Sequence, residues 1–227
     1  MRYFCFALLC ALSVTLTAQQ ETGSSRRNFK GGLVAGGVTS QISGDGLGGW
    51  DKFGFTAGAW VSVPFTEQLS ATMSMKFINK GSRTKLDTLT YNTFGYYLNY
   101  VEVPIWLCYS VSKKEPGKMV VNLGPYAGYL FNQKIVANGF DYPINPQFES
   151  IDIGIEAGVS FWVTPKFSVN LMTSTSVLPT RPNPSQVNPL NYYEKGNFNQ
   201  TLQLTFTKSF MGTSTYNSFE KSKSKVF

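Results

Sequence analysis

The chain has 227 residues, a formal net charge of +7, three cysteines and no histidine. The absence of histidine excludes Ser-His-Asp and Cys-His catalytic sites and removes the commonest zinc ligand. A site based on lysine or carboxylates would remain available, but we expect no enzyme, no catalytic residue, no metal site and no cofactor. The basic residues are scattered and accompany no nucleic-acid-binding motif, so we also expect no nucleic-acid partner.

The first 18 residues have the layout of a cleaved secretory signal peptide. Arg2 gives a positive start, an apolar stretch runs to Leu16, and the small residue Ala18 precedes Gln19. The stretch is too short for a spanning helix, so we predict export, with cleavage between Ala18 and Gln19. Cleavage would leave Cys108 as the remaining cysteine, and a single cysteine cannot form an internal disulfide.

Segments in which apolar and polar residues alternate recur along the rest of the chain. In 151–163, apolar residues hold every odd position, whereas Asp152 and Glu156 occupy even positions. A period of two is typical of a β-strand with one apolar and one polar face. The predicted strands, in chain order, are 29–42, 53–65, 69–77, 97–111, 119–131, 151–163, 167–177 and 198–210.

The first predicted strand, 29–42, is rich in glycine and its alternation is ambiguous. Its GGLVAGGV stretch, 31–38, lacks the GxxxxGK[ST] spacing and the following helix of a phosphate-binding loop. Glycines in a strand permit bending and the close approach of a neighbouring strand. We therefore interpret these glycines as structural.

Periodicity alone does not say whether the apolar faces line a soluble core or meet lipid. The predicted strands run to about 9–14 residues, longer than the usual 5–6, and a tilted strand needs about 9–11 residues to cross a membrane. Short connections at 66–68, 112–118 and 164–166 alternate with long ones, as in bacterial barrels with short periplasmic turns. These features predict an all-β fold: a single eight-stranded antiparallel up-and-down transmembrane β-barrel, with both termini on the periplasmic side.

Aromatic residues cluster where the predicted apolar faces end, as expected for rings at the level of lipid headgroups. Those expected near the short-turn rim are Phe65, Tyr109, Phe161, Phe167 and Phe210. Those expected near the long-loop rim are Phe53, Phe77, Tyr97, Phe131 and Phe198. The apolar residues of 151–163 should therefore face lipid, and the acidic ones should face the lumen.

An eight-stranded barrel has an interior just wide enough for side chains to fill. Because an unpaired buried charge costs several kcal/mol, we expect Lys76 to pair with one or more lumen carboxylates. Such a network would plug the barrel, and a proton path or ligand site built from the same carboxylates is the alternative. The predicted inward residues include Lys76, Glu102, Asp152 and Glu156, together with Trp60, Trp106, Asn170 and a catalytically inert Cys108.

The sequence predicts one folded domain in the outer membrane of a Gram-negative bacterium. The expected organisation is a signal peptide at 1–18, a flexible lead-in at 19–28, the barrel domain at 29–210 and a polar basic tail at 211–227. The expected partners are outer-membrane lipid and lipopolysaccharide, the barrel assembly machinery, and other envelope or secretion proteins.

Five segments between Phe29 and Phe210 carry a family likeness. They are FKGGLVAGGVTSQISGD, FGFTAGAWVSVPFTEQLSATMSMKFINKGS, LNYVEVPIWLCYSV, VNLGPYAGYL and DIGIEAGVSFW. Together they resemble the PorT-like family of outer-membrane β-barrel proteins, most specifically in YVEVPI after a long loop and in KGS at the end of the third strand. The resemblance implies an outer-membrane barrel of about eight strands without catalytic residues, and the family's named member belongs to a protein-secretion and gliding apparatus.

One feature departs from the family pattern. Relatives usually end near the terminal aromatic residue of the last strand, which serves as an assembly signal, whereas 17 residues follow Phe210 here. We interpret the protein as a plugged barrel that acts structurally, through its loops, or as a subunit of secretion machinery. Two alternatives are a narrow, porin-like transport pore and a soluble periplasmic lipocalin-like barrel that binds a ligand.

Overall fold

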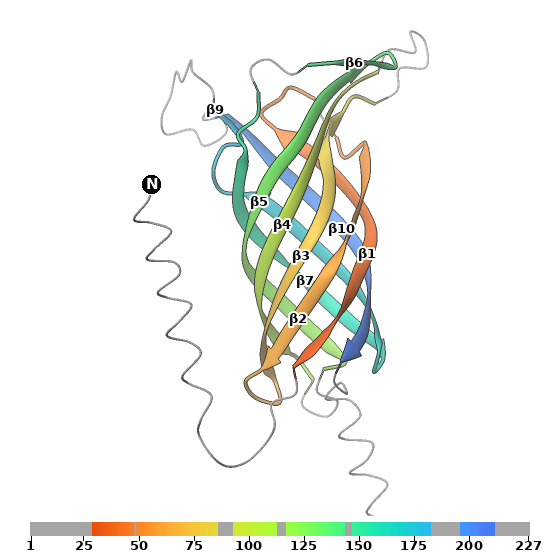
Figure 1. The fold of residues 1–227 in the computed structure, drawn as a ribbon, viewed down its shortest axis with the longest axis vertical. Helices are drawn as coiled ribbons and strands as arrows, with labels where there is room; N and C mark the ends of the chain where they lie inside the picture. The colour runs from red at the N-terminus through yellow and green to blue at the C-terminus, as the bar shows by residue number, and fades with distance from the viewer. Residues whose placement is uncertain are drawn as a thin grey trace, which may run out of the picture.

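Eight long strands form a closed barrel in the computed structural model of the chain (Figure 1). The structure describes residues 29–47, 49–85, 93–112, 117–143, 147–182 and 196–211. The predicted signal peptide, its cleavage position at Ala18 and Gln19, the lead-in and all of the tail except Met211 lie outside these residues. No helix among the described residues is long and apolar enough to cross a membrane.

The barrel strands follow one another in chain order, and each pairs antiparallel with the next. They are β1 (Lys30–Ser43), β2 (Lys52–Pro64), β3 (Leu69–Arg83), β4 (Phe94–Ser110), β5 (Met119–Ala137), β7 (Ile151–Thr164), β8 (Phe167–Ser176) and β10 (Gly196–Met211). Pairing of β1 with β10 closes the sheet, so it has no free edge along the wall. The prediction of an eight-stranded antiparallel up-and-down barrel is confirmed.

Several strands continue beyond their predicted ends, and two short strands add to the rim. β3 reaches Arg83 rather than 77, and β5 reaches Ala137 rather than 131. The short strand β6 (Phe140–Tyr142) forms a hairpin with β5, and β9 (Arg181–Pro182) pairs with the start of β10. Figure 1 shows both short strands at the same end of the barrel, which we call the long-loop end.

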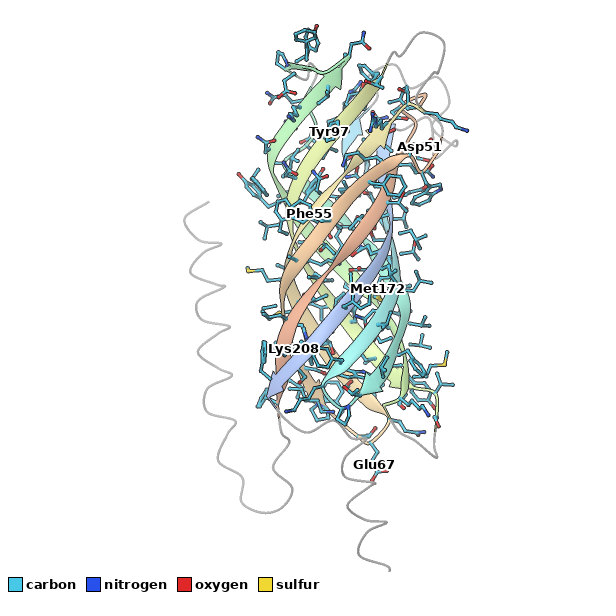
Figure 2. All side chains as sticks on the ribbon, turned by 90° about the vertical axis from the view of Figure 1, so that its right-hand side faces the viewer. Asp51, Phe55, Glu67, Tyr97, Met172 and Lys208 are labelled. Carbon is cyan, nitrogen blue, oxygen red and sulfur yellow. The ribbon has the colours of Figure 1, made fainter. Side chains whose placement is uncertain are left out.

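At the opposite end, which we call the short-turn end, two turns are each stabilised by a threonine hydroxyl that accepts a backbone hydrogen bond. The Thr66 hydroxyl accepts a hydrogen bond from the Leu69 backbone N–H at 2.9 Å. The Thr164 hydroxyl accepts one from the Phe167 backbone N–H at 3.1 Å. A hydroxyl that bonds backbone groups a few residues ahead stabilises a tight turn. Figure 2 shows Glu67 of the first turn at this end, and Asp51 and Tyr97 towards the other.

The glycines of β1 allow close approach of β10. A Cβ at Gly32 would lie 1.9 Å from the Lys208 carbonyl oxygen, and one at Gly36 would lie 2.2 Å from that of Leu204. A side chain at either position would force the two strands apart. The structural interpretation of the glycine-rich stretch therefore has a direct physical basis, because the β1–β10 seam closes the barrel.

The barrel is apolar outside and polar inside. Ile151 and Ile153 are 61% and 42% exposed, whereas Asp152 and Glu156 are completely buried. The lumen also holds many hydroxyl and amide side chains from all the long strands. A lipocalin-like barrel would need its apolar faces turned inward, so that alternative does not agree with the structure.

Most of the expected aromatic residues project outward at the two rims. Phe65, Tyr109, Phe161, Phe167 and Phe210 are exposed, as are Phe53 and Phe131 at the other rim. Phe198 was expected beside these, and that prediction was wrong, because only 1% of its surface is exposed. Its strand begins at Gly196, where β9 pairs with it, so the wall at this end of β10 includes a further strand that the prediction lacks.

Candidate functional site in the barrel lumen

Two lysines from β3 extend into the lumen because Lys76 and Lys80 share the inward side of the strand. The Lys76 ammonium donates to Glu156 Oε1 at 2.7 Å and to Gln203 Oε1 at 3.0 Å. Gln203 in turn donates to the same Glu156 oxygen at 3.0 Å. The three side chains form a closed triangle that connects β3, β7 and β10 across the lumen.

Lys80 forms the centre of a second cluster. Its ammonium lies 2.5 Å from Glu102 Oε1 and 2.8 Å from Asp152 Oδ2. The same ammonium lies 4.5 Å from the ring centroid of Tyr100 and 5.0 Å from that of Tyr126. Two carboxylates and two aromatic faces therefore surround this cation, a combination that compensates for its loss of hydration.

Gly128 on β5 makes room for this second cluster. It pairs in register with Glu102 on one side and with Asp152 on the other. A Cβ at Gly128 would lie 3.2 Å from Glu102 Cγ and 3.3 Å from Tyr100 Cδ1. The missing side chain leaves the space between the two carboxylates that the Lys80 ammonium bridges.

Among the described residues, Asp152 has four side-chain partners in the lumen. Besides Lys80, its carboxylate accepts hydrogen bonds from Ser176 Oγ at 2.7 Å, Asn199 Nδ2 at 2.9 Å and Tyr126 OH at 3.3 Å. These partners come from β3, β8, β10 and β5. A buried carboxylate with this many donors is satisfied without water, as buried polar groups in native proteins usually are.

The structure places all four predicted lumen residues in ion pairs, and Lys76 pairs with a lumen carboxylate as expected. Lys76 binds Glu156, whereas Glu102 and Asp152 bind Lys80. Sequence reasoning missed Lys80 because the third strand was predicted to end at residue 77. The signal that could have found it is parity, since Lys80 lies four residues after Lys76 and shares its face.

The charged side chains of the two clusters connect different strands of the barrel across the lumen. In these two clusters, Lys76 and Lys80 face three carboxylates, and Glu102 and Glu156 each keep one oxygen without a partner among the described residues. Cys108 is buried, and its thiol contacts Thr72 Oγ1 at 3.3 Å. Within the described part of the chain, no group of three or more His, Cys, Asp or Glu side chains could hold a metal ion.

An apolar layer of buried side chains adjoins the Lys80 cluster and extends from it towards the long-loop end. Its buried members are Val38, Ile42, Ile78, Leu98, Tyr100, Leu130 and Phe148. Phe148 comes from the connection between β6 and β7, and its backbone N–H donates to Gln133 Oε1 at 2.9 Å. Its ring lies 5.6 Å from that of Tyr96, and the Arg181 guanidinium lies 5.4 Å from it. Phe148 is thus buried against the apolar layer at the long-loop end.

At the short-turn end, the lumen widens into a cavity of about 140 Å³. Its walls include Trp60, Trp106 and Trp162, together with hydroxyl and amide side chains. Residues of the β2–β3 turn, among them Thr66 and Glu67, line its mouth. The lumen therefore has three zones: an apolar layer, two ion clusters, and a cavity that opens towards the short turns.

The closed barrel with apolar outer and charged inner surfaces defines an outer-membrane β-barrel protein. Residues 17–181 match the model of the family described as Outer membrane protein beta-barrel domain, and the chain belongs to this family. Its location is accordingly the outer membrane of Gram-negative bacteria, and the short-turn end is the periplasmic one. No curated protein matches the sequence.

Several solved outer-membrane barrels are similar to the chain. The Ail attachment invasion locus protein of Yersinia pestis, in complex with the heparin analogue sucrose octasulfate, gives a TM-score of 0.47 at 14% identity, over 82% of this chain and 100% of Ail. Neisserial surface protein A gives 0.43 at 14% identity, over 80% and 97% of the two chains. OprG of Pseudomonas aeruginosa gives 0.41 at 13% identity, over 84% and 99%. We draw no inference about function from these similarities.

Proposed function

We propose that the protein is a plugged, non-conducting outer-membrane barrel that acts structurally or through its loops and periplasmic end. The observation that carries this proposal is the filled lumen between the Lys76 triangle and Phe148. Over this length, side chains from opposite walls bind one another directly, as in the Lys80–Asp152 pair. A barrel whose cross-section is occupied in this way leaves no continuous aqueous path.

The apolar layer is a second barrier of a different kind. Ile42, Leu98 and Leu130 are buried there and have no polar groups that could replace the hydration shell of an ion. Apolar constrictions block ion passage by excluding water. An ion would have to displace this layer and then the paired charges beneath it, so two independent features support a closed barrel.

Conductance across a planar lipid bilayer tests the proposal. The refolded full-length protein should insert without producing discrete current steps, while an open porin in the same membrane serves as the positive control. Phe148→Ala should also remain silent, because the ion clusters below the apolar layer are unchanged. Reproducible single-channel steps from the unmodified protein would overturn the proposal and favour the narrow transport pore.

We further propose that the long-loop rim contacts other envelope proteins, including secretion machinery. The resemblance to the PorT-like family in YVEVPI and its neighbouring segments supports this role. Phe140 and Tyr142 of the β5–β6 hairpin are exposed beyond the barrel wall and offer aromatic surface to a partner. The same proposal includes contacts of the outer face of the barrel with lipopolysaccharide and with the barrel assembly machinery.

Site-specific photo-crosslinking tests the rim contact. A crosslinking residue at Tyr142 should capture a discrete envelope protein in cells, whereas one at the lipid-facing Leu204 should give no protein adduct. Identical crosslinking patterns at both positions, or none at Tyr142, would contradict a partner at this rim.

A further inference from the structure

The cavity at the periplasmic end has the properties of a ligand site rather than of a packing defect. We propose that it binds a small neutral polyhydroxylated molecule, of the size of a single sugar ring. The site goes beyond the function proposed above, because it needs neither the loops nor a conducting lumen. The inference rests on the shape, the lining and the unsatisfied donors of the cavity.

The cavity is a pocket with one closed end. On β3 its lining ends at Ser74, and the next inward residue is Lys76. On β10 it ends at Thr205, and the next inward residue is Gln203. The Lys76 triangle therefore forms the floor of the pocket, and a ligand could enter only past the short turns, from the periplasm.

Three of the four tryptophans of the chain line this pocket. The rings of Trp60 and Trp162 meet edge to face, with centroids 6.2 Å apart and planes at 68°. Trp106 comes from β4, and its ring lies 5.6 Å from the Lys76 ammonium on the floor. Large aromatic surfaces with a few placed polar groups are the usual composition of small-molecule sites.

Two indole N–H groups point to a ligand with acceptor oxygens. Trp60 is 7% exposed, and within the described residues neither its Nε1 nor that of Trp106 has a hydrogen-bond partner. An indole N–H is a donor only, and leaving a buried donor unsatisfied costs free energy. Both nitrogens are fully buried, so each indole ring must turn towards the cavity before a hydroxyl or ring oxygen of a bound molecule can accept from it.

The remaining walls are neutral and already ordered. The Asn122 amide donates to Ser160 Oγ at 2.7 Å, and the Asn170 amide donates to Thr207 Oγ1 at 2.8 Å. Among the described lining residues, the charged ones are Lys30, near the start of β1, and Glu67 in the turn. Both belong to the mouth, and Lys76 on the floor is already paired with Glu156, so these described residues offer a charged ligand no unpaired counter-ion inside the pocket.

A sugar ring matches the aromatic walls, the polar groups and the volume of the pocket. Its C–H faces can lie against indole rings, and its hydroxyls can both accept from the indoles and donate to the serine and threonine oxygens of the wall. The cavity of about 140 Å³ has several times the volume of about 30 Å³ that one water molecule occupies in the liquid, so it has room for a small ring rather than for a single water. A purely apolar ligand would leave the hydroxyl-rich wall unsatisfied.

Calorimetric titration of the refolded full-length protein tests the site. The protein is held in lauryldimethylamine oxide, a detergent without a sugar group, and titrated with glucose and with N-acetylglucosamine. Saturable binding by at least one of the two is expected. Trp60→Phe keeps the ring but removes the N–H donor, and should weaken binding by about tenfold. Trp50→Phe, in the exposed β1–β2 connection, is the matched control and should bind as the unmodified protein does.

Three outcomes would overturn the proposal. The first is the absence of saturable heat with either sugar in a sample whose faster gel migration before boiling shows that it is folded. The second is binding that Trp60→Phe leaves unchanged, since the ligand would then lie elsewhere. The third is tighter binding of glucuronate or glucosamine than of glucose, because the site would then recognise charge.

Discussion

The Lys80 ammonium lies 2.8 Å from the Asp152 carboxylate, although 72 residues separate the two in sequence. Their strands, β3 and β7, are not neighbours in the sheet. The backbone ladder connects adjacent strands only, so this pair ties opposite walls of the barrel together. Ion pairs in the lumen therefore hold opposite walls of the barrel together, in addition to the backbone pairing that closes the sheet.

Removing the Lys80 cation should destabilise the barrel strongly. Lys80→Met leaves the side chains of Glu102 and Asp152 fully buried without their shared partner. Breaking a buried pair in this way typically costs about 3–5 kcal/mol. Urea unfolding in phospholipid vesicles, followed by tryptophan fluorescence, measures the loss in free energy of unfolding.

Lys134→Met is the matched control for that experiment. Lys134 pairs with Asp141 at 2.8 Å in the β5–β6 hairpin, with side chains 43% and 61% exposed. An exposed pair contributes at most about 1 kcal/mol. Equal losses in the two variants would mean that the buried cluster adds nothing beyond a surface ion pair.

Gly154→Ala should disturb the barrel where β7, β8 and Tyr126 meet. A Cβ there would lie 2.3 Å from the Thr175 carbonyl oxygen and 2.4 Å from the Tyr126 ring. Overpacking of this kind costs about 1–3 kcal/mol. Gly37→Ala, on the outer face of β1 with nothing within 4 Å, should be neutral or slightly stabilising. The urea midpoints of unfolding of the two variants measure this difference. A Gly154→Ala variant as stable as the unmodified protein would contradict the close packing around Gly154.

A lysine in the middle of the lipid-facing surface should cost more than one at the rim. Ile155 lies well inside β7, whereas Val163 lies beside the turn to β8, and both side chains are exposed. Ile155→Lys should lose about 2–4 kcal/mol and Val163→Lys about 0–1 kcal/mol, because the penalty depends on depth in the bilayer. Unfolding in phospholipid vesicles measures both losses in free energy. If Val163→Lys lost more than Ile155→Lys, the middle of the lipid-facing surface would not lie near Ile155.

Phe148→Ala should weaken the apolar layer at the long-loop end. The ring is buried among Tyr96, Leu98 and its other neighbours, so truncation creates a cavity and should cost about 3–5 kcal/mol. Phe140→Ala removes the same group from an exposed position and should change stability by less than about 0.5 kcal/mol. If the two variants unfold at the same urea concentration, Phe148 does not hold the mouth closed.

The sequence predicted the wall of this barrel well because alternation and strand direction are local properties. In 151–163, each residue's parity decided whether it faced lipid or lumen, and the exposures of Ile151 and Asp152 agree. The alternation weakens beyond Phe77, where Asn79, Gly81 and Arg83 replace the outward apolar residues. Alternation therefore predicts too early an end for the third strand, at residue 77, and leaves Lys80 outside it.

Pairing inside the lumen could not be predicted with the same success. Which carboxylate meets which lysine depends on the stagger between strands. The sequence pattern indicates only whether a side chain faces the lumen or the lipid. Gly128 illustrates this, since its role depends on being opposite both Glu102 and Asp152. The prediction for Phe198 was wrong for a related reason, because the short strand β9 pairs with that end of β10 and no alternation pattern indicates it.

Cell fractionation followed by gel electrophoresis of boiled and unboiled samples tests the central claim most directly. The apolar outer face and the charged, plugged lumen predict a protein in the outer-membrane fraction that migrates faster before boiling than after it. A soluble periplasmic protein with the same mobility in both samples would contradict the account, because the apolar faces would then have to lie inside.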